Sequence, residues 1–169
     1  MDNSYINKIE KAKIYASEPE RITFHEFVAT VRGDNAAHTV TFKDGVFESD
    51  GEFHKNHGYS AHSMALERIL KGMIPSPAAG DGHPASDSTY INKVEKAKIY
   101  AAERERITFL SFRATVRGDN SEHEVRYDNG QWDSDSSYFK THGYSAHTMT
   151  LERVLEGMIP SRAHSPSED

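Results

Sequence analysis

Apolar residues recur every three or four positions near the N-terminus, which is the spacing of one face of an α-helix. The apolar positions of this stretch are Ile6, Ile9, Ala12 and Ala16. Asn3 or Ser4 can cap the first turn, and Pro19 cannot continue a helix. The pattern therefore predicts a first helix that ends before Pro19.

The next segment alternates apolar and polar residues with a period of two, which is typical of a β-strand. Ile22 and Phe24 follow one alternation, whereas Phe27, Ala29 and Val31 follow another. Because the alternation shifts between these two sets, we expect one strand with an irregularity near His25–Glu26.

Two turns divide the following residues into a pair of shorter strands. Gly33-Asp34-Asn35 has the composition of a turn. A second strand is predicted from the alternation of His38, Val40 and Phe42. Asp44-Gly45 is a strong hairpin signal, so we expect Val46–Ser49 to form a third strand.

A second helical pattern begins after an irregular segment around residues 53–58. Ser60 can cap this helix, and Gly72 with Pro75 ends it. Its apolar face consists mostly of Ala61, Ala65, Leu66, Ile69, Leu70 and Met73. The order α-β-β-β-α predicts an α+β module with a small antiparallel sheet and two helices.

The whole unit occurs twice, because residue n aligns with residue n + 85 from Tyr5–Ala78 onto Tyr90–Ala163 without a gap. Of the 74 aligned pairs, 48 are identical, so each copy is expected to fold alike. We predict a first module over residues 1–76, a Pro/Gly/Ser-rich linker over 77–89, a second module over 90–162 and a disordered tail over 163–169.

Composition narrows the class of protein further. The 169 residues carry a formal net charge of −6, but each copy is close to neutral, with 9 basic and 10 acidic residues in the first and 11 of each in the second. No apolar run is long enough to span a membrane and no secretory signal is evident, so we expect a cytoplasmic protein. The chain has no cysteine, which excludes disulfides, thiolate metal sites and cysteine nucleophiles.

The segments FESDGEFHKNHGYSAHSMALERIL and WDSDSSYFKTHGYSAHTMTLERVL each include and follow the last strand of a hairpin. They resemble the SWIM zinc-finger family, whose pattern is C-x-C, a short spacer with aromatics, and C-x-H at the start of a helix. The pattern falls on Ser49, Gly51, Ser60 and His62 in the first copy and on Ser134, Ser136, Ser145 and His147 in the second. The resemblance covers Val28–Met73 and Arg113–Met158 and implies a hairpin leading into the ligand segment and a helix leaving it.

Only the histidine of each implied ligand set is present. A serine hydroxyl is a poor zinc ligand and Gly51 has no side chain, so we expect the ancestral zinc site to be lost and no cofactor to bind. Two origins are open, namely natural decay of the site and deliberate removal of the thiols. A unit of this size buries only about 60–65% of its unfolded surface, so its stability usually depends on a metal, a disulfide or a partner.

The remaining histidines and aspartates offer a weaker alternative, a residual metal site. Its candidate ligands are His57, His62 and Asp50 in the first copy and His142, His147 and Asp135 in the second. Two imidazoles and one carboxylate bind zinc weakly unless they are preorganised, so we interpret these rings as structural. His38 and His123 alternate with valines and are interpreted as strand histidines.

Two further motifs have plain structural explanations. The tripeptides Arg32-Gly33-Asp34 and Arg117-Gly118-Asp119 match the integrin-binding motif, but a Gly-Asp-Asn turn explains them fully. No nucleophile elbow or phosphate-binding loop is present, and Ser60 is better interpreted as a helix cap. We therefore predict that the chain is not an enzyme.

Binding functions remain. SWIM domains mediate DNA or protein interactions, so the resemblance implies a binding module. Two copies on a linker resemble a covalently joined dimer, for which the second helices, Leu66–Met73 and Leu151–Met158, offer a mutual face. The alternative is two separate modules on a string that bind a repetitive partner with avidity. We interpret the chain as a non-catalytic assembly protein acting through protein–protein contact or self-association, with nucleic-acid binding and residual zinc binding as alternatives. The basic cluster for nucleic acid is Lys8, Lys11, Lys13, Lys93, Lys96 and Lys98.

Overall fold

The computed structural model describes residues 3–74 and 88–159, and it confirms the predicted α+β class. The first copy contains α1 (Asn3–Ala16), η1 (Pro19–Arg21), β1 (Ile22–Arg32), β2 (Ala37–Lys43), β3 (Val46–Ser49), α2 (Glu52–His57) and α3 (Ala61–Ile69). The second contains α4 (Ser88–Ala102), η3 (Arg104–Arg106), β4 (Ile107–Arg117), β5 (Glu122–Asp128), β6 (Gln131–Ser134), α5 (Ser137–His142) and α6 (Ala146–Val154). Most of the expected linker and the whole expected tail lie outside the described residues, while Ser88 and Thr89 begin α4.

Local sequence signals account for most element boundaries. Asp44 and Gly45 have φ values of +52° and +82°, the left-handed conformations of the tight hairpin turn that this dipeptide favours. The hydroxyl of Ser60 accepts a hydrogen bond from the N–H of Ser63, which confirms the predicted cap of α3. The short helix α2 differs from the irregular segment that we expected there. It ends at Gly58, whose φ is +82°.

The two copies share one six-stranded antiparallel sheet in the order β3-β2-β1-β4-β5-β6. β1 pairs with β4 along nearly its whole length, and Phe27 lies opposite Phe112, its own counterpart in the other copy. A pseudo-twofold axis therefore passes between these two residues. The register shifts at Phe24/Glu26, which confirms the predicted irregularity, and again at the equivalent position of β4.

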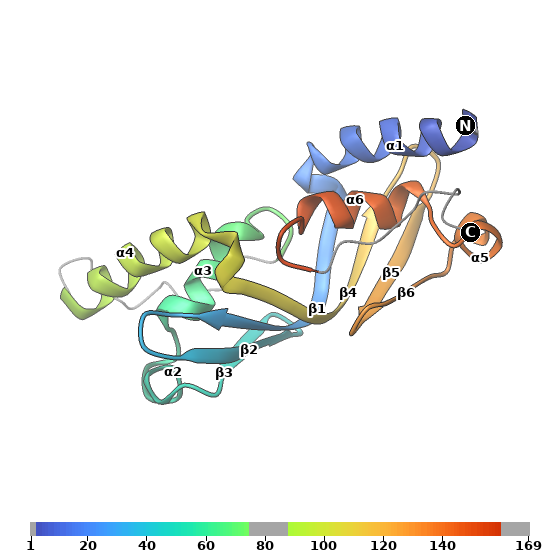
Figure 1. The fold of residues 1–169 in the computed structure, drawn as a ribbon. Coiled ribbons are helices and arrows are strands. Elements are labelled where there is room, and N and C mark those ends of the chain that lie inside the picture. The colour runs from blue at the N-terminus through green and yellow to red at the C-terminus, as the bar shows by residue number, and fades with distance from the viewer. Residues whose placement is uncertain (1–2, 75–87, 160–169) are drawn as a thin grey trace.

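The first helix of each copy packs on the other copy. Figure 1 shows α1 beside α6 and α4 beside α3, and these are the main helix–helix contacts of the described structure. The expected mutual face between the two second helices is therefore wrong. Each second helix uses its apolar residues against the sheet and against a helix from the other copy.

One core runs beneath the helices and through both copies. Its largest fully buried side chains include Phe24, Phe27 and Phe42 of the first copy and Phe109 of the second. Phe27 contacts Phe109 with ring centroids 5.4 Å apart and the rings close to perpendicular, a favourable aromatic geometry. Within the described residues, no helix is long and apolar enough to cross a membrane.

Candidate functional site

The positions that the family resemblance singles out in the first copy come together around one pocket. Ser49 ends β3, Gly51 precedes α2, Ser60 caps α3, and His62 lies in the first turn of α3. All four line a pocket of about 170 Å³. Its other wall is α4 of the second copy, through Lys93, Lys96 and Tyr100. The site is therefore composite, because neither copy encloses it alone.

The serine hydroxyls of this pocket accept hydrogen bonds from backbone N–H groups. Ser49 Oγ accepts a hydrogen bond from the N–H of Gly51 at 3.1 Å, and Ser60 Oγ accepts one from the N–H of Ser63 at 3.1 Å. The Ser63 hydroxyl in turn accepts the N–H of Ser60 at 3.1 Å, which completes a capping box. Both hydroxyls thus stabilise local backbone, and neutral hydroxyls supply none of the thiolates of a cysteine zinc site.

The second copy repeats this arrangement with one addition. Ser134 Oγ accepts the N–H of Ser136 at 3.2 Å, and Ser145 Oγ accepts the N–H of Thr148 at 3.1 Å. Ser136 Oγ caps α5 by accepting the N–H of Phe139 at 3.2 Å. Glycine at the equivalent position of the first copy provides no side-chain cap to α2. Ser60, Ser136 and Ser145 therefore act as helix caps, whereas Ser49 and Ser134 bind backbone N–H groups in the turns after β3 and β6.

His62 is wedged between the two copies. Its ring lies 4.8 Å from that of His38 and 5.7 Å from that of Tyr100, measured between centroids. A Cβ at Gly33 would approach its Nε2 atom to 2.7 Å, so only glycine fits beneath the ring. Burial, with a smaller contribution from His38, lowers the pKa of His62 to about 4. His147 occupies the equivalent position and its pKa is lowered to about 4 for the same reasons, with His123 as the neighbour.

The other candidate ligands point elsewhere. Asp50 Oδ1 lies 3.0 Å from Nδ1 of His38 and accepts the N–H of Thr39, so this carboxylate holds a strand histidine. His57 stacks on Phe53 at 3.9 Å, and its Nδ1 atom lies 3.0 Å from the carbonyl oxygen of Phe53. Asp135 and His142 repeat these contacts in the second copy. Across residues 3–74 and 88–159, no three His, Asp or Glu side chains are placed to hold a metal ion.

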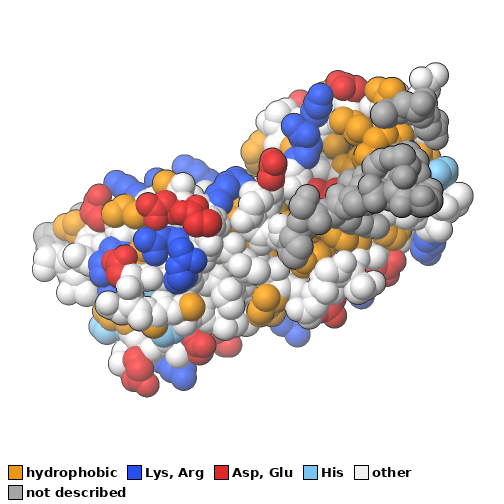
Figure 2. Space-filling view, in the orientation of Figure 1, with side chains coloured by type: hydrophobic (Ala, Val, Ile, Leu, Met, Phe, Trp, Pro, Cys, Tyr) orange, Lys and Arg blue, Asp and Glu red, His pale blue; other side chains and the backbone are white. Residues whose placement is uncertain are grey.

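The six lysines of the expected basic cluster all have partners within the protein. Lys8 and Lys93 lie over the rings of Tyr138 and Phe53, each 4.3 Å from the centroid. The other four form ion pairs, namely Lys11–Asp119, Lys13–Glu10, Lys96–Asp34 and Lys98–Glu95. Four of the six contacts cross from one copy to the other. In Figure 2, basic and acidic side chains are interspersed on the visible face and do not form a single basic surface.

The Arg-Gly-Asp turns belong to the same interface between copies. Asp34 lies 3.7 Å from Lys96 and 3.9 Å from Arg106, and its backbone N–H donates to the hydroxyl of Tyr100. Arg106 also donates to the carbonyl oxygen of Arg32 at 2.9 Å. Each tripeptide therefore positions the first helix of the other copy. Asp34 does so for α4, and Asp119 makes the equivalent contacts with α1 and its flanking residues.

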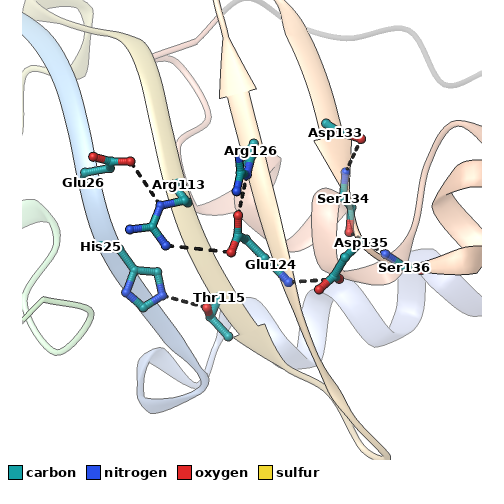
Figure 3. Close-up of polar contacts among 10 residues, drawn as sticks. All are labelled: His25, Glu26, Arg113, Thr115, Glu124, Arg126, Asp133, Ser134, Asp135 and Ser136. Atoms are coloured by element: carbon teal, nitrogen blue, oxygen red, sulfur yellow. Dashed lines mark hydrogen bonds and ion pairs between the residues drawn. The ribbon is translucent and has the colours of Figure 1, made fainter.

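The face of the sheet opposite the main helices carries a second candidate surface, which the sequence analysis did not single out. A pocket of about 510 Å³ spans the pseudo-twofold axis there, and small residues such as Val28, Thr41 and Ser111 line it. Figure 3 shows the row of charges across this face, in which Arg113 lies between Glu26 at 3.1 Å and Glu124 at 3.8 Å. A second pair, Arg126–Glu124, extends the row. Along β1, Glu26, Val28 and Thr30 alternate in sequence with residues of the core, and this alternation was the signal that could have located this face.

Comparisons with known proteins add no assignment to this geometry. No family model, no curated protein and no solved structure matches the chain.

Proposed function

We propose that this chain is a non-catalytic, cytoplasmic binding and assembly protein whose two copies hold each other in one pseudo-dimer. The observation that carries the proposal is the pairing of β1 with β4 together with the exchange of the first helices. Each half of the molecule is completed by a helix from the other copy. Association between copies is therefore part of the fold, and a partner would meet a joined surface rather than two separate modules.

A protein partner is favoured over nucleic acid. Four of the six lysines of the basic cluster are in ion pairs, and both Arg113 and Arg126 of the open sheet face contact Glu124. Binding to a phosphate backbone depends on free cationic groups that release counterions, so neutralised side chains contribute little to it. The open face offers a hollow lined by apolar, hydroxyl and oppositely charged groups, a mixture that suits a protein surface better than a phosphate backbone.

Zinc binding is the weaker alternative for the composite pocket. The hydroxyls of Ser49 and Ser60 are engaged by backbone N–H groups, and His38 is held by Asp50. This supports SWIM-like ancestry with a lost metal site, because the four positions converge as that pattern implies. The proposal gives the pocket a structural role at the interface between copies.

The proposal is tested by perturbing one copy and observing the other. Trp132 is the only tryptophan and lies in the second copy, so its fluorescence reports unfolding of that copy. Tyr15 belongs to the first copy, is 2% exposed, and accepts the N–H of Asp119. We expect Tyr15→Ala to destabilise the Trp132 transition by about 3 kcal/mol, as large aromatic deletions from a core do.

Tyr100→Ala serves as the matched control. Tyr100 belongs to the second copy and makes the equivalent contacts with Asp34 and His62 of the first copy. In urea, fluorescence and far-ultraviolet circular dichroism should give coincident transitions for the wild type and both variants. A Trp132 transition that is unchanged in Tyr15→Ala would overturn the proposal. Separately, binding of a labelled DNA duplex that weakens steeply with salt would favour nucleic acid as the partner.

A further inference from the structure

The pairing of β1 with β4 uses residues that are mostly the same in the two copies. The two strands differ at three positions only, namely His25, Glu26 and Val28 against Leu110, Ser111 and Arg113. The tyrosines that hold the exchanged helices, Tyr15 at Asp119 and Tyr100 at Asp34, are also equivalent residues. Most contacts between copies would therefore form equally well between two first copies, or two second copies, of different chains.

Two of the three differing positions flank the pseudo-twofold axis on the open face of the sheet. On one side of the axis, Glu26 lies opposite Arg113. On the other side, Val28 lies opposite Ser111. Glu26 and Ser111 are equivalent positions of the two copies, and so are Val28 and Arg113. We call these four residues the central seam.

Only the pairing of unlike copies brings opposite charges together in the central seam. Nε of Arg113 donates to Oε2 of Glu26 at 3.1 Å, as Figure 3 shows. In the same register, two first copies would place each Glu26 opposite a valine. Two second copies would place each Arg113 opposite a serine. Two unlike pairs therefore contain two of these ion pairs, whereas one pair of each like kind contains none.

His25, the third differing residue, does not select between the pairings. Its Nε2 atom lies 2.7 Å from Oγ1 of Thr115. Leu110, at the equivalent position of the second copy, has no polar atom for such a contact. Two first copies could form the histidine contact twice and two second copies not at all, so the total equals that of two unlike pairs. Selection therefore depends on the central seam.

We propose that Glu26 and Arg113 make the association specific for unlike copies, so that the partner of a first copy is a second copy. The inference rests on the proposed function and names the partner that its interface accepts. Pairing of like copies from different chains would leave the other copy of each chain free to recruit a further chain, which is a contact that does not close. The unlike pair closes within one chain, where the covalent connection gives the two copies a high effective concentration.

The expected preference follows from the exposure of the ion pair. The side chains of Arg113 and Glu26 are 33% and 37% exposed, so the pair contributes about a two- to threefold factor to the pairing constant. Arg113 also lies 3.8 Å from Glu124 of its own copy, a contact that a like pair would keep. Two ion pairs lost together should favour unlike pairs about fivefold over random pairing.

Native mass spectrometry of the chain cut between its copies tests this preference. A protease site is inserted between Asp81 and Gly82, and the purified full chain is cut, unfolded in urea and refolded by dilution. We expect unlike pairs in about fivefold excess over random pairing, expressed as an equilibrium constant. Glu26→Gln and Arg113→Gln should each return the mixture close to random proportions. Arg126→Gln is the matched control, because it removes an ion pair to Glu124 that lies within the second copy.

The uncut chain provides a second measurement, through exchange of the seam residues between copies. Glu26→Ser/Val28→Arg and Ser111→Glu/Arg113→Val each give both copies the same seam residues. The equilibrium constant of unfolding in urea should rise about two- to threefold in each. Combining all four substitutions places glutamate and arginine opposite each other again, on the other side of the axis, and should restore the constant of the wild type.

Random proportions in the cut wild type would overturn the inference, as would a preference that survives in both Glu26→Gln and Arg113→Gln or is lost in Arg126→Gln. A fourfold variant no more stable than the two double variants would overturn it as well. Cut halves that do not pair again would contradict the proposed function, and the seam exchange in the uncut chain then decides the inference alone. None of these variants changes Tyr15 or Tyr100, so failure here is distinct from failure of the Tyr15→Ala experiment.

Discussion

Acidification should destabilise the protein through the two wedged histidines. Burial lowers the pKa of His62 and of His147 from an ordinary 6.5 to about 4. In the unfolded chain each ring binds a proton near pH 6.5, whereas in the folded protein it stays neutral until about pH 4. The unfolded state therefore binds more protons in this window, so stability is full above pH 6.5 and falls as the pH drops toward 4.

The size of the effect follows from the two pKa values. A shift of one pKa unit corresponds to about 1.4 kcal/mol, and because the unfolded ring is half protonated at pH 6.5, each ring contributes a loss of about 2.2 kcal/mol between pH 6.5 and 4.5. Both rings keep some contact with water, which screens the interaction, and about 1.5 kcal/mol per ring is a realistic expectation. His38, Lys93, Asp50 and Tyr100 are the neighbours whose charges and contacts shape the response of His62.

The assay is urea unfolding at pH 7.5, 6.5, 5.5 and 4.5, with the free energy of unfolding plotted against pH. Paired carboxylates also lose stability in acid, so the wild type is compared with His62→Gln/His147→Gln, which keeps those carboxylates. His57→Gln/His142→Gln removes two exposed rings and serves as the control substitution. Nuclear magnetic resonance titration of the ring protons gives the two pKa values directly. If the His62→Gln/His147→Gln variant keeps the pH slope of the wild type, or if the wedged rings titrate near pH 6.5, the reasoning is refuted.

Three other substitutions test separate parts of the structure. Gly33→Ala should lower the free energy of unfolding by about 1–3 kcal/mol, since its Cβ would lie 2.7 Å from a packed imidazole, and an unchanged urea midpoint would contradict this. Introducing Ser49→Cys, Gly51→Cys and Ser60→Cys together should let the first copy bind one zinc ion, as native mass spectrometry would show, because the three positions line one pocket with His62. Burial raises the pKa of Glu67, because the ionised carboxylate is less stable in the folded protein than in water. The free energy of unfolding therefore falls as the pH rises above about 4.5. Glu67→Gln should therefore stabilise the protein at pH 7 but much less at pH 4, and equal gains in urea unfolding at both values would count against it.

Local features of the fold could be predicted from the sequence because their causes are local. The Asp44-Gly45 turn depends on two adjacent residues that tolerate positive φ, and the cap of α3 depends on Ser60 and its neighbour three positions later. The strand irregularity near His25–Glu26 was visible as a change in the alternation of apolar residues. Each of these signals lies within a few residues of the structure that it specifies.

The arrangement of the two copies could not be predicted, because its determinants are distant in sequence. The apolar periodicity of the second helices predicts that one face of each is buried, but it does not identify the element that covers that face. They are covered by the sheet and by the first helix of the other copy, and this pairing joins residues far apart in the chain. The lysines were interpreted as a basic cluster for the same reason, since their partners Asp34 and Asp119 lie far from Lys96 and Lys11 in sequence.

The exchanged helix explains how modules of this size fold without cysteine. A unit of about 74 residues leaves much of its surface exposed and usually requires a metal, a disulfide or a partner. Here the composite pocket is closed by Tyr100, whose hydroxyl accepts the N–H of Asp34 and whose ring contacts His62. Gly33 allows that contact because any larger residue would collide with the imidazole. The histidine that the resemblance assigns to zinc is thus held by the other copy, and the same contact joins the two halves into one molecule.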